Sequence, residues 1–177
     1  MIISSDQITI LKEELDKDCI AQCMLLSLRQ QRKDNVLCDA IIKCCNKEFP
    51  VHRSVLYAYS LYCRKLLLGS FPPKTENGLV EIDLDCFSEN TVRVLLDVMY
   101  GDTSEESVNI DIEEFLKLAD FLQVDYEIEV VTAIFRKLLS TDNCLEIYNL
   151  ASTYNFRKLA NVALTISGDQ LKGDYEE

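Results

Sequence analysis

Glycine and histidine are scarce in this chain of 177 residues, which holds five glycines and one histidine. The phosphate-binding motifs G-x-x-x-x-G-K-[ST] and G-x-G-x-x-G are absent, and so is the zinc motif H-E-x-x-H. The one histidine, His52, lies where a predicted strand passes into a predicted helix. A Cys–His nucleophile pair would need Cys63 or another cysteine to fold beside it, which nothing in the spacing favours. We therefore expect a protein without catalytic activity and a structural His52 hydrogen-bonded to the main chain.

Long apolar segments are missing as well. The sequence has no stretch of about 18 apolar residues, so it predicts no transmembrane helix. The first residues, Met1 to Asp6, lack the basic and apolar regions of a signal peptide. We expect a cytoplasmic protein, with the nucleus as an alternative, that does not contact membranes.

Basic residues are few, and they are unevenly placed. The net charge is −12, and only seven of the 18 basic side chains, against 21 of the 30 acidic ones, follow residue 77. An acidic surface repels phosphate backbones, so we expect no nucleic-acid partner. The densest acidic stretch, from Asp102 to Glu129, is consistent with solvated helix faces or with a docking surface for a basic partner.

The eight cysteines are scattered rather than paired. A zinc site typically needs C-x₂-C with a second pair downstream. The closest spacings are Cys19/Cys23 and Cys44/Cys45, and neither has a matching pair; neighbours on a strand also point to opposite faces. We expect buried thiols in a reducing compartment and no metal or cofactor, with a zinc site or a redox pair as alternatives.

Hydrophobic periodicity predicts a mixed α/β (α+β) fold. Short strands are expected at residues 8–10, 36–45, 49–51, 79–84 and 108–110. Helices are expected at residues 18–31, 55–68, 88–100, 112–122, 126–139 and 156–166, with another beginning after Asn143. Ser88 and Asp111 are the expected N-caps of two of these helices. The first strand would have to pair with something outside its own neighbourhood, such as another subunit.

Asp39 interrupts an otherwise apolar predicted strand, and Arg53 follows the strand that returns beside it. A buried carboxylate is costly unless it is paired, so the sequence predicts an Asp39–Arg53 ion pair. Such a pair could fix the strand register, or it could belong to a charged pocket at a subunit seam.

Several of these segments resemble the BTB/POZ family of protein-interaction domains, in the right order and at the right distances. The matching segments are Leu37-Cys38-Asp39-Ala40, Phe49 to Leu56, Ser60-Leu61-Tyr62-Cys63, Val94 to Gly101 and Leu118 to Val124. Residues from Asn143 to Tyr154 resemble the start of the BACK domain of kelch-like proteins. The resemblance spans about residues 18 to 166.

The resemblance implies a small sheet with clustered helices and a homodimer. The domains would be an N-terminal segment (1–17) with an exchanged strand, a BTB/POZ domain (18–139), the first BACK helices or 3-box (140–167) and a flexible tail (168–177). The family's dimer seam uses the N-terminal helix and the exchanged strand. Here these would contribute Ile8, Ile10, Ile20, Met24 and Leu28.

Kelch-like members of the family are substrate adaptors that bind the N-terminal domain of cullin-3 in RING ubiquitin ligases. The resemblance implies a cullin-3 contact at Phe71, Tyr100, Tyr154 and Asn155. Pro73 stands where the family's hydrophobic–x–Glu motif has its glutamate. A substrate protein would bind through a region outside this chain. The alternative is a BTB scaffold, or a dimer that recruits a transcriptional co-repressor, without cullin binding.

Overall fold

The structure, a computed structural model, describes residues 17–69, 78–102, 110–124, 135, 139, 140 and 142–173, and the side chains of 19–167 within these ranges. Its helices are α2 (Lys17–Lys33), α3 (Arg53–Tyr59), α4 (Leu61–Leu68), α5 (Glu89–Met99), α6 (Ile112–Phe121), α8 (Cys144–Thr153) and α9 (Arg157–Gly173). Its strands are β1 (Ala40–Cys44), β2 (Lys47–Val51) and β3 (Val80–Asp83). The predicted α/β fold class is confirmed.

The three described strands form one small sheet in the order β2-β1-β3. β1 runs antiparallel to β2 and parallel to β3, so that Ala40 lies opposite both Val51 and Val80. β2 begins at Lys47, two residues before the predicted strand at 49–51, so the turn between β1 and β2 is short. It consists of Cys45 and Asn46, both with positive φ (52° and 61°), as tight two-residue hairpins require.

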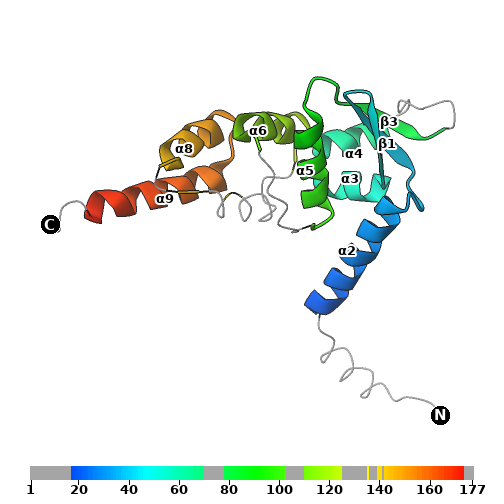
Figure 1. Cartoon of the computed structure of the whole chain (residues 1–177), viewed down its shortest axis with the longest axis horizontal. Helices are drawn as coiled ribbons and strands as arrows, with labels where there is room; N and C mark the ends of the chain where they lie inside the picture. The colour runs from blue at the N-terminus through cyan, green and yellow to red at the C-terminus, as the bar shows by residue number, and fades with distance from the viewer. Residues whose placement is uncertain are drawn as a thin grey trace, which may run out of the picture.

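Apart from α2, the helices lie to one side of the sheet and extend the molecule away from it (Figure 1). α3, α4 and α5 lie nearest the sheet, α6 follows, and the α8–α9 pair forms the far end. α5 carries an apolar stripe at helical spacing, and its members Val92, Leu95, Leu96 and Met99 are all buried in the core. The small sheet and the helices packed against it therefore share one hydrophobic core.

One predicted helix, over residues 55–68, is wrong because the chain breaks at Ser60 into α3 and α4. Ser60 has extended backbone angles (φ −125°, ψ 119°) and forms a bridge with Val124. Its hydroxyl donates to the carbonyl oxygen of Leu122 at 2.5 Å and accepts from the main-chain N–H of Cys63. Hydrogen bonds to a distant segment thus replace helical ones, and a local apolar period carries no sign of them.

Both predicted N-caps are confirmed: Ser88 accepts from the N–H of Thr91, and Asp111 accepts from the N–H of Glu114. The final helix is longer than expected, since α9 continues to Gly173 and includes residues 168–173 of the predicted tail. The predicted strands at 8–10 and 108–110 and the predicted helix at 126–139 lie wholly or mostly outside the described residues.

Glu114 on α6 binds the start of α5. Its carboxylate accepts from the N–H of Ser88 at 2.7 Å, from the Ser88 hydroxyl at 2.6 Å and from the hydroxyl of Thr91. Burial by itself raises the pKa of Glu114, but these hydrogen bonds and the charge of Lys117 outweigh burial and lower it. The carboxylate therefore stabilises the packing of α6 against α5 only while it is ionised.

Replacing Glu114 by Gln should lower the free energy of unfolding by about 1–2 kcal/mol at neutral pH, because charge-assisted hydrogen bonds are lost. A carboxyl whose pKa is depressed by folding stabilises above its unfolded value, about 4.3, and loses this effect as pH falls through the folded value. The difference in unfolding free energy between wild type and Glu114→Gln, measured by urea titration, should therefore shrink as the pH falls below about 4.3. Glu113→Gln, which removes an exposed pair with Lys117, is the matched control. An equal loss in both variants would contradict this role.

Candidate partner-binding surfaces

Helix α2 projects from the body and is anchored mainly at its C-terminal half (Figure 1). The guanidinium of Arg29 donates to the carbonyl oxygen of Gly101 and lies 3.4 Å from a carboxylate oxygen of Asp102. Arg32 pairs with Asp97 at 3.1 Å and lies over the ring of Tyr100, 5.0 Å from its centroid. Two arginines thus hold α2 against the C-terminal end of α5, where exposed helix carbonyls favour positive charge.

Gly101 lets α2 approach this closely. Its φ is +65°, and a Cβ added there would lie 3.2 Å from Cδ1 of Leu25 on α2. Both the left-handed backbone and the close contact favour glycine.

One face of α2, which we call its apolar face, carries Ile20, Met24 and Leu28 at four-residue spacing. Ile20 is 43% exposed and Met24 62% exposed, while Leu28 is half-buried and packs against the core. Leu26 is also exposed, but it lies about 160° around the helix from Met24. The predicted seam residues Ile20, Met24 and Leu28 thus include two with unburied apolar surface. The other two, Ile8 and Ile10, lie outside the described residues.

A second exposed apolar area, which we call the aromatic surface, is formed by Tyr62 on α4, Phe87 before α5 and Phe121 on α6. The Phe121 ring lies 5.4 Å from that of Tyr62 and 5.7 Å from that of Phe87, centroid to centroid. Phe121 is nevertheless 44% exposed, although Tyr62 and Phe87 are half-buried. α4 ends at Leu68, which is 73% exposed and lies just before residues 70–77. No pattern in the sequence predicted that these three side chains would meet.

The four predicted cullin-3 contacts fall in different environments. Phe71 lies outside the described residues. Tyr154 is half-buried, and Asn155 is exposed with a positive φ of 60° in the turn between α8 and α9. Tyr100 is fully buried, with 0% exposure, so its side chain has no surface to offer a partner. The prediction for Tyr100 is therefore wrong for this structure.

Tyr100 instead bonds to His52 inside the core. The N–H of His52 donates to the Tyr100 hydroxyl at 2.9 Å, and the hydroxyl lies 2.8 Å from Nδ1. The hydroxyl, already accepting, donates to Nδ1, which leaves the ring proton on Nε2, 3.2 Å from the carbonyl oxygen of Val36. Burial raises the pKa of Tyr100, so the phenol stays protonated. The expected structural role of His52, bonded to the main chain, is confirmed.

The predicted buried ion pair between Asp39 and Arg53 is wrong. Asp39 is exposed, and its carboxylate accepts from the main-chain N–H of Arg53 at 2.7 Å. No ion pair joins the two side chains in the described structure. The segments are adjacent, as predicted, but the carboxylate binds the first N–H of α3, where a helix N-terminus favours negative charge.

Catalytic or metal chemistry finds little support in the described part of the chain. None of its His, Cys, Asp and Glu side chains form a group of three or more that could hold a metal ion. Cys63 lies in the core, and Cys38 lies 3.9 Å from Nε2 of His52; burial raises the pKa of both thiols. Activated cysteine nucleophiles have the opposite shift.

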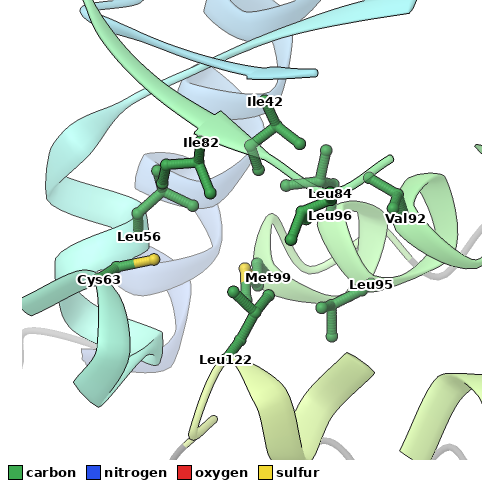
Figure 2. Close-up of a pocket in the computed structure, with 10 residues that line it drawn as sticks. All are labelled: Ile42, Leu56, Cys63, Ile82, Leu84, Val92, Leu95, Leu96, Met99 and Leu122. Atoms are coloured by element: carbon green, nitrogen blue, oxygen red, sulfur yellow. The ribbon is translucent and has the colours of Figure 1, made fainter. Parts of the chain in front are cut away.

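Figure 2 shows an apolar cavity of about 10 Å³ in the core, lined by residues such as Cys63, Met99 and Leu122. A ligand site is usually hundreds of Å³, and even a water needs about 10–15 Å³ and polar partners. This cavity is a packing defect. Among the described helices, none has the length and apolar composition to cross a membrane.

Comparison with known proteins agrees with the fold. Human Kelch-like protein 11 is 34% identical over 161 residues, which cover 84% of this chain and 22% of that protein. The chicken Zinc finger and BTB domain-containing protein 7A is 30% identical over 125 residues, or 70% of this chain and 22% of that protein. The chain thus spans about a fifth of the length of these relatives.

Among solved structures, the BTB domain of zebrafish PATZ1 superimposes with a TM-score of 0.52 at 26% sequence identity. The match covers 70% of this chain and 97% of that domain. The BTB/POZ domain family itself matches residues 28–139, from within α2 to the end of the segment after α6. With its sheet, its clustered helices and this match, the chain belongs to the BTB/POZ family.

Proposed function

We propose that this chain is a non-catalytic, dimeric BTB module that acts as a substrate adaptor and binds cullin-3 in a RING ubiquitin ligase. The observation that carries the proposal is the aromatic surface. It presents a partly exposed Phe121 ring supported by Tyr62 at the start of α4, the helix that precedes the segment with the predicted contact Phe71. The kelch-like relatives favour the same function.

The aromatic surface has the features of a hot spot for protein binding. Interface hot spots are enriched in aromatic side chains held in well-packed surroundings. Phe121 is fixed by two ring contacts, so little side-chain entropy is lost when a partner covers it. We therefore place Phe121 and Tyr62 in the cullin-3 contact set with Phe71, Tyr154 and Asn155, and remove Tyr100.

We assign the helices after residue 140 to the start of a BACK domain. α8 and α9 pack against each other through Ile147, Ala151, Leu159 and Ala163, all buried. This pair continues the body from α6 outward (Figure 1). It would lengthen the surface available to a cullin, in the manner of the 3-box that the sequence predicts over 140–167.

The remaining partners follow from the same proposal. The apolar face of α2 would be covered by a second copy of the chain, with the first 17 residues contributing an exchanged strand. A substrate protein would bind a region outside this chain. The acidic net charge of −12 does not favour nucleic acid or anionic membranes, and a cytoplasmic or nuclear location is consistent with the free thiols.

The test is a calorimetric titration with the cullin-3 N-terminal domain, with light scattering in parallel to measure mass. We expect sub-micromolar binding, with one cullin per chain and two chains per particle. A dimer that releases no heat and gains no mass would contradict the adaptor function, and would leave the BTB module intact.

A second function is favoured by the similarity to a zinc-finger BTB protein and to the PATZ1 BTB domain. The chain would then be a scaffold that recruits a transcriptional co-repressor. Pro73, in place of the family's glutamate, is consistent with this function because proline cannot supply a carboxylate. This scaffold function would be identified by a dimer that binds a co-repressor peptide and does not bind cullin-3.

A further inference from the structure

Cys44 and Cys45 occupy an unusual arrangement at the end of β1. Neighbours on a strand point to opposite faces, so the sequence predicts that these two thiols point apart. The positive φ of Cys45, 52°, interrupts the alternation at the hairpin turn. As a result the two sulfur atoms lie 3.7 Å apart.

Both thiols bind the same acceptor. The carbonyl oxygen of Phe87 lies 3.1 Å from the sulfur of Cys44 and 3.4 Å from that of Cys45. The main-chain N–H of Cys45 donates to the carboxylate of Asp85 at 2.7 Å, which holds the 85–87 turn against the hairpin. Cys44 is buried, whereas Cys45 is exposed. The Cys45 thiol is thus accessible to a reagent in solution, whereas the Cys44 thiol is buried beside it.

We propose that Cys44 and Cys45 form a reversible thiol–disulfide switch that a low-molecular-weight disulfide, such as glutathione disulfide, closes. The exposed Cys45 thiolate attacks the reagent, forming a mixed disulfide and releasing one glutathione thiolate. The Cys44 thiolate then attacks the sulfur of Cys45, forming the Cys44–Cys45 bond and releasing the second. Two thiols are oxidised, one glutathione disulfide is reduced, and the two protons pass to the released thiolates.

The environment of Cys44 makes the second step the slow one. Burial raises the pKa of Cys44 to about 12, helped by the neighbouring Cys45 thiol and by the negative charges of Asp85 and Glu89. Lys47 offers little compensation, because it pairs with Glu89 at 2.8 Å. Since the thiolate is the nucleophile, closure should accelerate about tenfold per pH unit below this pKa.

The bridge would also be easy to open. Neighbouring Cα atoms are about 3.8 Å apart across a trans peptide, less than the usual span of about 4.4–6.8 Å for a disulfide. A strained bridge is readily reduced, which suits a regulatory role rather than a structural one.

Closing the bridge would act on the aromatic surface through Phe87. Oxidation removes both S–H donors from the Phe87 carbonyl, and the ring of the same residue packs on Phe121. This part rests on the proposed cullin-3 function. We expect the oxidised protein to bind the cullin-3 N-terminal domain several-fold more weakly than the reduced protein.

The modification is tested by mass spectrometry of the whole chain and its peptides after incubation with glutathione disulfide. We expect wild type to lose two hydrogen atoms in the peptide that contains both cysteines, faster at higher pH. Cys44→Ala should stop at a glutathione adduct on Cys45, and Cys45→Ser should give no bridge in this peptide. Cys86→Ser is the control, because Cys86 is also exposed, lies in the adjoining turn and should not matter.

A stable glutathione adduct on Cys45 in wild type would overturn the switch, and so would a bridge that Cys86→Ser abolishes. Calorimetry on reduced and oxidised protein then separates the two proposals. If reduced protein does not bind cullin-3, the proposed function fails while the bridge can still form. If reduced and oxidised protein bind equally, the coupling through Phe87 fails while the adaptor function stands.

Discussion

Replacing Phe121 by Ala is expected to weaken binding of the cullin-3 N-terminal domain by about 2 kcal/mol, or roughly 30-fold in Kd. The ring is the most exposed member of the aromatic surface, and its contacts with Tyr62 and Phe87 hold it in one position. Truncation removes both the apolar area that a partner would cover and the support for its two neighbours. Calorimetry with wild type and variant measures the change directly.

The matched control is Val36→Ala, which truncates an apolar side chain of similar exposure between α2 and β1, outside both the aromatic surface and the α8–α9 pair. It should change the dissociation constant by less than about twofold, as surface truncations outside a hot spot do. Far-ultraviolet circular dichroism and light scattering should show both variants folded and of wild-type mass. Equal weakening in the two variants, or none in Phe121→Ala, would remove the aromatic surface from the contact.

Elements governed by local chemistry were predicted well from the sequence. α5 begins at the predicted Ser88 cap, and α6 at the predicted Asp111 cap, because a cap depends on residues three positions apart. The hairpin was predicted, although its turn proved shorter. The turn residues Cys45 and Asn46 both adopt positive φ although neither is glycine. Their residue types alone therefore did not predict a two-residue turn.

Features that join distant segments were not predicted. Ser60 ends α3 because residues 122–124 supply its hydrogen bonds, and no pattern within 55–68 indicates them. The aromatic surface likewise unites positions 62, 87 and 121, each of which looks like an ordinary core residue in its own segment. The one available signal was Phe121, an aromatic residue at the end of α6 that lies outside the buried positions of the helix.

Tyr100 and Asp39 show the limits of reasoning from residue type. An aromatic residue in a matching motif was predicted to face a partner, but its hydroxyl satisfies two groups of His52 in the core. A carboxylate in an apolar strand was predicted to need an arginine side chain, but a main-chain N–H at the start of α3 satisfied it. In both cases a group within the chain, and not the predicted partner, satisfies the polar atoms of the side chain.

Met24→Asp on α2 is expected to dissociate the proposed dimer. Met24 is 62% exposed, beside Ile20, so within one chain its replacement costs little stability. In a dimer that covers this face, the substitution buries an unpaired carboxylate in apolar surroundings. A penalty of about 3 kcal/mol would raise the dimer dissociation constant by roughly 100-fold. Analytical ultracentrifugation over a range of concentrations measures this constant.

Gln22→Asp is the control, since it adds the same charge to the same helix about 160° away around its axis, at 3.6 residues per turn. Gln22 is exposed, and its variant should remain a dimer of nearly wild-type affinity. If both variants dissociate, the helix charge rather than the apolar face governs assembly. If Met24→Asp stays dimeric, the seam lies elsewhere, and the arginines that anchor α2 to α5 serve only to stabilise the single chain.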